Sequence, residues 1–375
     1  MHFHAIGNIA EEWELNPHPT RHATQLPVAD AAPFTANLVT STSEIAQYEE
    51  FVRSLAAEPG MLSPAFFLAS VSPAGWRPLL VVVWEEQRIA GLLYCKERVV
   101  AGIGIRMAFG NDELGAMVVA RPEDAESVMA CGVSALLKHM VALRFVVSSA
   151  YLPVLKSVQA DTDFSFYRCK DHAHLDLPRT FEKFLARLGP KTRRNFRYYR
   201  RKSEQAGNEF VSTLAPEEFF MAAQDLLPKA AYAKRSSKHT QTRHRAMIEA
   251  MPSPMLVGIR RASGQWIGLA GGWHVGQRAF LIMQLNDRTY ERESLSIVLR
   301  SYLIEMLIDR GYRELVFLGG SSPPLTYYAN YPEGFMAYLD ARSLPWRVGR
   351  GAWGLVRKFA PVTFGRLLNS FVRGL

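Results

Sequence analysis

The sequence contains one apolar hairpin pattern twice, and this repeat limits what the chain can fold into. Within residues 78–93, two runs of strand-forming residues flank a polar turn at 85–88. Residues 253–272 show the same arrangement around a turn at 261–265. A short polar turn between two apolar runs predicts a β-hairpin. We therefore expect one hairpin in each half of the chain.

A helix and a short strand are expected after each hairpin. Helical patterns cover residues 122–144 and 293–310, and the apolar segments 145–147 and 315–318 follow them. Hairpin, further strands, helix and strand are together the order of a mixed α/β unit. Finding that order twice indicates two similar lobes. The alternative is coincidence, because this order is common.

The predicted lobes leave a segment at each end of the chain. A length of 375 residues has room for two domains of ordinary size. The first residues are rich in Pro, His, Thr and Ala and show no periodicity, which favours a partly ordered leader. We therefore divide the chain into a leader at 1–40, a first lobe at 41–170, a second lobe with a basic helix at 171–340 and a basic amphipathic tail at 341–375.

Composition and motifs exclude several classes of protein. Cys95, Cys131 and Cys169 are far apart, so the sequence has neither a disulfide framework nor a paired-cysteine zinc site. Walker-A, HExxH and GxSxG motifs are also missing. No apolar run approaches the roughly 20 residues that cross a bilayer. The N-terminus does not resemble a secretory signal. We therefore predict no metal and a cytoplasmic protein.

The positive charge is concentrated in two places. The formal net charge is +9, and residues 191–245 hold 13 Lys/Arg against five Asp/Glu. In a helix over residues 191–202, Arg193, Arg197 and Arg201 share a face, and arginine suits phosphate or carboxylate. We expect this face to bind an anionic small-molecule substrate. The alternative is a solvated basic face.

The tail carries the second concentration of charge. At helical spacing its apolar residues share one face, with arginines beside it. This pattern is typical of a helix that lies on a membrane surface. The same pattern also suits a helix docked on the second lobe, which we favour slightly, and peripheral attachment to the inner membrane face is the alternative. The apolar residues are Phe364, Leu367, Leu368, Phe371 and Val372.

Three segments carry a resemblance to a known family. They are FEKFLARLGPKTRRNFRYYRRKSEQAG, GQWIGLAGGWHVGQRAFLIMQLND and RTYERESLSIVLRSYLIEMLIDRGYRELVFLGG, within residues 180–331. This region resembles the acetyltransferases called BioF2-like or CelD-like. That family belongs to the Gcn5-related N-acetyltransferase (GNAT) superfamily and is akin to the FemAB peptidyltransferases. The resemblance implies tandem GNAT-like lobes, with the second more typical.

The resemblance also implies a reaction. A protein of this family is expected to move an acyl group from acetyl-CoA or another acyl-CoA to an amine, such as one on a cell-envelope or polysaccharide precursor. One alternative is FemAB-like aminoacyl transfer, with aminoacyl-tRNA as the partner. Another is a non-catalytic binding protein that has lost the CoA loop, because residues 290–296 contain no glycine.

Candidate residues follow from the resemblance and the chemistry. In such folds helix N-terminal amides hold the CoA pyrophosphate, although residues 292–296 can also be a plain helix cap. Acyl transfer to an amine needs a base and an acid. The cofactor-binding candidates are Arg292, Glu293, Ser294, Leu295 and Ser296; the catalytic candidates are the bases Asp287 and Glu291 and the acids Tyr327 and Tyr328; the substrate-binding candidates are Arg193, Arg197, Arg201, Trp273, His274 and Gln284.

Overall fold

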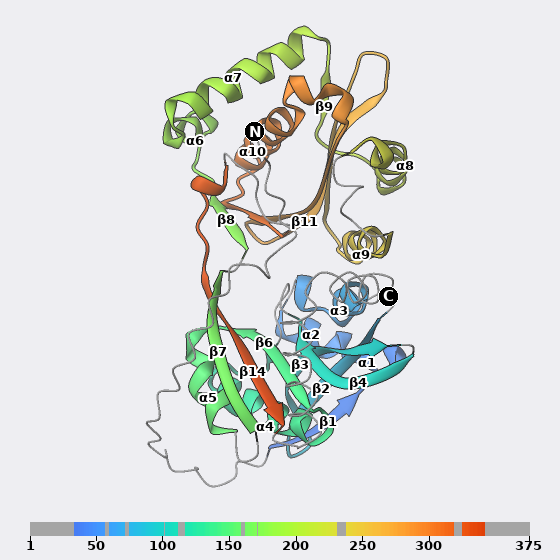
Figure 1. The fold of residues 1–375 in the computed structure, drawn as a ribbon, viewed down its shortest axis with the longest axis vertical. Coiled ribbons are helices and arrows are strands. Elements are labelled where there is room, and N and C mark those ends of the chain that lie inside the picture. Colours follow the sequence, from blue (N-terminus) through green and yellow to red (C-terminus); the bar gives the residue numbers. More distant parts are fainter. Residues whose placement is uncertain are drawn as a thin grey trace, which may run out of the picture.

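Two lobes, each built on a mixed β-sheet, lie one above the other along the long axis of the molecule (Figure 1). The computed structural model describes residues 34–56, 60–71, 75–100, 102–111, 117–158, 162–170, 172–230, 238–318 and 325–341. Almost all of the predicted leader and tail lie outside these ranges.

The first lobe contains an eight-stranded sheet in the order β1-β2-β3-β4-β6-β14-β7, with β5 paired to β3. Helices α4 and α5 pack on one face, and α1 to α3 cover part of the other. The elements are β1 (Phe34–Val39), α1 (Thr42–Ala46), α2 (Glu49–Leu55), α3 (Pro64–Val71), β2 (Trp76–Glu85), β3 (Arg88–Val100), β4 (Ile103–Gly110), β5 (Met117–Val119), α4 (Ala125–His139), β6 (Ala142–Val147), α5 (Leu152–Ser157), β7 (Thr162–Lys170) and β14 (Glu333–Ala341).

The second lobe contains a six-stranded sheet in the order β8-β13-β12-β11-β10-β9. Helices α6, α7 and α10 pack on one face, and α8 and α9 pack on the other. The elements are β8 (Ala173–Asp176), α6 (Phe181–Arg187), α7 (Pro190–Gln205), β9 (Glu209–Val211), α8 (Pro216–Leu226), α9 (Lys238–Glu249), β10 (Pro254–Arg260), β11 (Trp266–Val275), β12 (Arg278–Asn286), α10 (Leu295–Asp309) and β13 (Glu314–Phe317).

The two sheets have the same strand topology. The antiparallel series β1-β2-β3-β4 in the first lobe corresponds to β9-β10-β11-β12 in the second. Each series continues with a parallel neighbour, β6 or β13, reached through one long helix, α4 or α10. An antiparallel strand, β14 or β8, then completes the match. The prediction of two similar α/β lobes is therefore confirmed.

Two strands lie differently from the predicted boundaries. Residues 34–39, assigned to the leader, form β1 at the edge of the first sheet. β14 covers Glu333–Ala341, the end of the predicted second lobe and the first residue of the predicted tail, and it inserts between β6 and β7 of the first lobe. Alternation places Phe335, Ala337 and Leu339 on one face of a strand, and they pack in the first lobe's core. Alternation predicts a strand, but it does not identify the sheet that the strand joins.

The predicted helix over 122–144 is too long. A 3₁₀ turn covers Pro122–Asp124, α4 ends at His139, and β6 already begins at Ala142. Lys138 and His139, basic residues in the last turn, are the sequence signal for the end of α4, and the prediction did not use them. The chain changes from helix to strand at Met140, whose backbone is extended, at φ −107° and ψ 146°.

Apolar side chains join the two lobes. Phe66 of α3 packs in the same cluster as residues of α8, α9 and β11. Its ring meets the ring of Trp273 edge-on at 5.1 Å. Trp273 itself is fully buried. Contacts of this kind fix the lobes against each other, since buried aromatic pairs contribute beyond their area.

Candidate functional site

The central strands of the second sheet separate part-way along their length. β12 and β13 pair in parallel from Arg278 and Glu314 up to Leu281 and Phe317, and the amide of Leu318 donates to Leu281. β12 continues to Asn286. Among the described residues no named strand pairs with this last part of β12 on the β13 side, and Ala230 forms an isolated antiparallel bridge with Asp287 just beyond it. Its edge therefore offers backbone groups to a ligand.

A bulge in β12 decides which side chains face this gap. The register against β11 shifts at Ile282, because Gly271 faces Met283 whereas Gly272 faces Leu281. A side chain at residue 272 would clash with the carbonyl oxygen of Phe280, so the close approach requires glycine. The extra residue moves Gln284 onto the face of the sheet that α10 covers.

Three side chains form a polar chain beside the gap. The Gln284 amide nitrogen lies 3.3 Å from the hydroxyl of Ser296, in the first turn of α10. Its amide oxygen accepts from Nε of Arg300 at 2.9 Å. Gln284 and Ser296 are candidates from the sequence, and the structure brings them together. Arg300 is not among those candidates, although an arginine inside so apolar a helix is a visible signal.

Arg300 is a buried cation between the two separating strands. It is 9% exposed, and its guanidinium lies 5.5 Å from the centre of the Phe317 ring of β13. Burial lowers the pKa of Arg300 to about 10, which leaves the group charged at neutral pH. A fixed positive charge therefore lies beside the gap, where it would attract an anionic or strongly polar ligand.

The start of α10 lacks a side-chain cap. Ser294 precedes the helix with φ 51° and ψ 45°, in the left-handed region, and its side chain makes no capping hydrogen bond. Ser294 thus takes a conformation that normally favours glycine. In the described part of the chain, no backbone carbonyl accepts from the amides of Leu295 or Ser296. These amides form the positive end of a buried helix.

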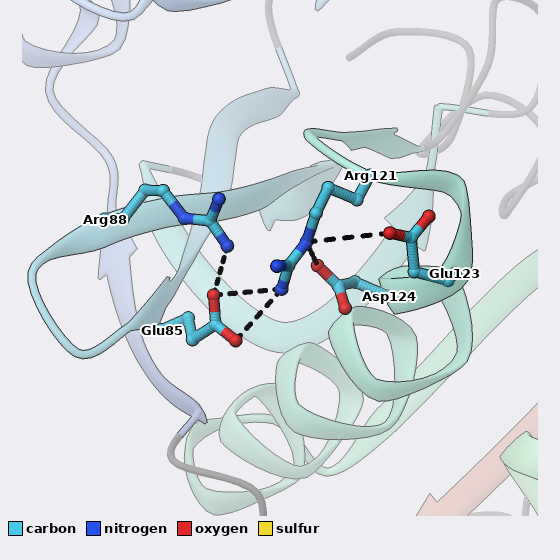
Figure 2. A network of polar contacts seen from close by, with 5 residues as sticks. All are labelled: Glu85, Arg88, Arg121, Glu123 and Asp124. Atoms are coloured by element: carbon cyan, nitrogen blue, oxygen red, sulfur yellow. Dashed lines mark hydrogen bonds and ion pairs between the residues drawn. The ribbon is translucent and has the colours of Figure 1, made fainter.

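Ion pairs surround the corresponding helix start in the first lobe (Figure 2), where Asp124 makes no capping hydrogen bond either. Arg121 precedes α4, and its Nε donates to Asp124 at 2.6 Å. Its terminal nitrogen donates to both oxygens of Glu85, which also binds Arg88. Glu123 lies 4.0 Å from Arg121. Three carboxylates at the α4 terminus disfavour another anion there.

The two predicted bases differ in environment. Asp287 directly follows β12 and is 3% exposed; its Oδ1 accepts from the amide of Thr289 at 2.9 Å and caps the 3₁₀ helix Arg288–Glu293. Glu291 lies on that 3₁₀ helix and is exposed, as is Arg292. Glu293 is half-buried. Of the two bases, only Asp287 is held in a fixed place.

The two predicted acids also differ. Tyr327 is 80% exposed. Tyr328 packs against the core beneath α10, and its hydroxyl oxygen accepts from the amide of Gly189 at 2.7 Å. Gly189 is the N-cap of α7. Because the Tyr328 hydroxyl accepts this bond, its own proton stays available to a second partner.

Trp273 and His274 lie away from the gap. Trp273 is fully buried at the contact between the lobes, where it cannot touch a substrate. His274 pairs with Ala279, whereas the open end of β12 is at Asn286. Ala279 lies two residues, about 7 Å, before Leu281, where β12 and β13 separate, and the open edge runs away from it. His274 instead stacks on Tyr312 at 4.3 Å, and burial followed by the charge of Arg310 lowers its pKa to about 4.

The three arginines predicted to share an anion-binding face have different partners. Arg193 is half-buried and donates to the carbonyl of Leu188 at 3.4 Å. Arg197 pairs with Glu182 at 2.7 Å. Arg201 is exposed. Two of the three therefore already have partners within the protein, and their role towards a substrate stays a prediction.

Comparison with protein families identifies the second lobe. Residues 190–328, from the start of α7 to Tyr328, match the family model described as an acetyltransferase (GNAT) domain. The chain carries a GNAT acyltransferase domain. This finding agrees with the resemblance in the sequence and with the shared topology of the lobes.

Solved structures share the fold over both lobes. The C-terminal domain of an Agrobacterium fabrum protein named as a lysylphosphatidylglycerol synthetase has a TM-score of 0.53 at 12% identity, covering 84% of this chain and 97% of that one. L-PGS from Bacillus licheniformis has a TM-score of 0.53 at 13% identity, covering 82% and 94%. FemX has a TM-score of 0.53 at 9% identity, covering 80% and 96%.

A search of curated protein sequences found no match. No helix in the described ranges is long and apolar enough to cross a membrane. The same ranges hold no group of three His, Cys, Asp or Glu side chains placed to bind a metal.

Proposed function

We propose that the second lobe transfers an acyl group from acyl-CoA to an amine, at the gap between β12 and β13. The separation of these strands after Leu281 and Phe317 carries the proposal, because it exposes a strand edge beside an uncapped helix start. The first lobe has the same topology, but Arg121 and three carboxylates lie around the start of α4. The reaction is therefore assigned to the second lobe.

The chain offers a suitable place for the cofactor. The amides of Leu295 and Ser296 lie at the positive end of α10, where helices bind phosphate groups. Arg300 adds a charge beside the same gap. Glu293 opposes these groups, and Glu291 is directed to solvent at the rim. When bound, acyl-CoA supplies the activated thioester.

Side chains around the gap supply the remaining roles. Gln284 and Asn286 lie on the α10 side of β12 and orient the acceptor through their amides. Asp287 accepts the proton of the attacking amine at its carboxylate. Tyr328 donates its hydroxyl proton to the leaving thiolate, whereas the exposed Tyr327 is less suited.

The substrate classes follow the resemblance and the charge of the lobe. Acetyl-CoA is the proposed donor, and the proposed acceptor is an amine on an anionic cell-envelope or polysaccharide precursor. For its negative groups we propose Arg193 and Arg197, on the flank of α7 between its anchored and outward faces. We place the protein in the cytoplasm, at the inner face of the membrane.

A turnover assay tests the proposal. Acetyl-CoA is incubated with an amino sugar, a lysine peptide or a polyamine, and release of free thiol is followed. We expect thiol release with at least one amine. Tyr328→Phe should slow it by about 10²-fold or more, whereas Tyr327→Phe should leave it unchanged. Equal effects of the two changes would reject Tyr328 as the acid.

The carboxylates of Glu291 and Glu293 favour a second candidate, aminoacyl transfer from aminoacyl-tRNA. The negative charges of these carboxylates disfavour a pyrophosphate at the start of α10. The aminoacyl ester of a tRNA carries no pyrophosphate. The fold likeness to FemX and to L-PGS also supports this candidate. Transfer of a labelled amino acid from tRNA, with no thiol released from acetyl-CoA, would replace the first proposal.

A further inference from the structure

Helix α7 lies at the end of the second lobe farthest from the first lobe (Figure 1). Its inner face is anchored. Phe196 and Ser203 are buried, and Arg200 pairs with Glu305 of α10 at 2.6 Å. The guanidinium of Arg200 also lies 4.2 Å from the centre of the Tyr302 ring. The orientation of α7 about its own axis is therefore fixed, and so is its outward surface.

The outward surface is a stripe of cations around one tyrosine. At about 100° per residue, six side chains fall within an arc of about 100° opposite the anchored face. The four cations among them are exposed, and the tyrosine is 50% exposed. The six side chains of this outer stripe are Lys191, Arg194, Tyr198, Arg201, Lys202 and Gln205.

The nearby acids neutralise other arginines instead. Glu182 binds Arg197, and Glu204 binds Arg200. Within the part of the chain that the structure describes, no carboxylate lies within ion-pair distance of the four stripe cations. The stripe therefore presents uncompensated positive charge, which calls for an anionic partner outside the chain.

The shape of the stripe selects among anionic partners. The eleven residue-to-residue steps from Lys191 to Lys202 span about 16 Å along a convex helix. A convex row meets a flat surface along its whole length, and a half-exposed tyrosine suits the headgroup level of a bilayer. Single-stranded nucleic acid is held in a groove with several stacking aromatics, whereas this stripe contains only Tyr198.

We propose that the outer stripe of α7 docks the protein on an anionic phospholipid bilayer through headgroup phosphates. This contact differs from the membrane attachment that the sequence leaves as an alternative for the tail. It holds the second lobe against the membrane without any insertion of the chain. It also does not depend on the reaction that the lobe catalyses.

Co-sedimentation of the full chain with vesicles tests the proposal. One set contains equal parts phosphatidylglycerol and phosphatidylcholine, and the other contains phosphatidylcholine alone. We expect binding to the first set only, weakened between about 0.1 M and 0.5 M salt as the Debye length falls. Each basic residue near an anionic surface contributes about a fivefold factor. Changing Lys191, Arg194, Arg201 and Lys202 to Gln should therefore weaken binding on the order of several hundredfold.

A charge-matched variant controls for net charge. Changing Arg53, Arg88, Arg168 and Arg278 to Gln also removes four of the nine net charges, at exposed sites away from α7. Its binding should stay within about threefold of the parent, because charges beyond a Debye length from the surface are screened. Melting curves check that both variants are folded.

Several outcomes would overturn the proposal. One is no binding of the parent protein to the phosphatidylglycerol vesicles. Another is an equal loss of vesicle binding in the two charge variants. A third is a loss of vesicle binding only in the tail variant that combines Phe364→Gln and Phe371→Gln. Binding to transfer RNA without binding to vesicles would also reject the bilayer. If the charge variants behave as expected, a moderate loss of vesicle binding in Tyr198→Ser would support contact of this tyrosine with the headgroup level.

Discussion

Ser294→Gly should stabilise the protein, although glycine normally weakens a helix. Ser294 lies at φ 51° immediately before α10. In the left-handed region a residue with a Cβ costs about 1–2 kcal/mol. Glycine removes that cost. It also makes the unfolded chain more flexible, which lowers stability by about 0.4–1 kcal/mol. We therefore expect a net gain of about 0.5–1 kcal/mol.

The gain corresponds to a small but measurable shift in melting temperature. If all 375 residues unfold together, an unfolding entropy of about 2.1 cal/mol/K per residue converts the gain into about 1 °C. Scanning calorimetry is the assay, and Ser294→Ala is the matched control, because alanine keeps the Cβ. A glycine variant that melts below the parent, or together with the alanine variant, would refute left-handed strain at this residue.

Three further predictions concern other parts of the molecule. Trp273→Ala should destabilise folding by about 3–5 kcal/mol, because the side chain fills the contact between the lobes; an altered KM at unchanged stability would instead point to a substrate role. His274 has a pKa of about 4 in the folded protein against 6.5 in the unfolded chain, so protonation of the unfolded chain should lower the stability of the fold as the pH falls from 6.5 to 4. His274→Phe should reduce this loss of stability. An unchanged dependence of stability on pH in that variant would contradict the burial of His274. Gln284→Leu should cost about 1–3 kcal/mol in urea unfolding, because the buried Nε of Arg300 loses its acceptor; unchanged stability would show that this bond is unimportant.

The repeated lobe could be predicted because its signals are local. Polar turns at 85–88 and 261–265 mark both hairpins, and each is followed by a long, largely apolar helix-forming segment. Assignment of strands to sheets could not be predicted in the same way. The pattern of β14 is that of any half-buried strand, and its place between β6 and β7 depends on contacts far apart in the chain.

The candidate site was partly predictable. Gln284 and Ser296 were named from the sequence, and the structure brings them within 3.3 Å. Simple alternation puts Gln284 on the wrong face of β12, and only the bulge at Ile282 corrects this. Gly271 and Gly272 were the available signal for that bulge. Trp273 was predicted to bind substrate but is buried, because the sequence alone does not distinguish an aromatic residue that lines a cleft from one that packs in a core.

The sequence contained one further signal for the candidate site, which is Arg300. Glu305 of α10 stays partly exposed and pairs with Arg200, whereas Arg300 is a charged residue buried with the apolar side chains of the helix. Such a residue needs a polar partner, and Gln284 supplies one at 2.9 Å. The identity of that partner depends on the gap between β12 and β13, which involves residues far apart in the sequence.

Calorimetric titration with acetyl-CoA tests the central claim most directly. Ser296→Asp places a negative charge in the first turn of α10, where it favours the helix but repels a pyrophosphate. Ser296→Asn is the neutral match. The parent and Ser296→Asn should bind acetyl-CoA with similar affinity, and Ser296→Asp should bind at least about tenfold more weakly. No binding by the parent, or equal affinity in all three proteins, would contradict a donor site at the start of α10.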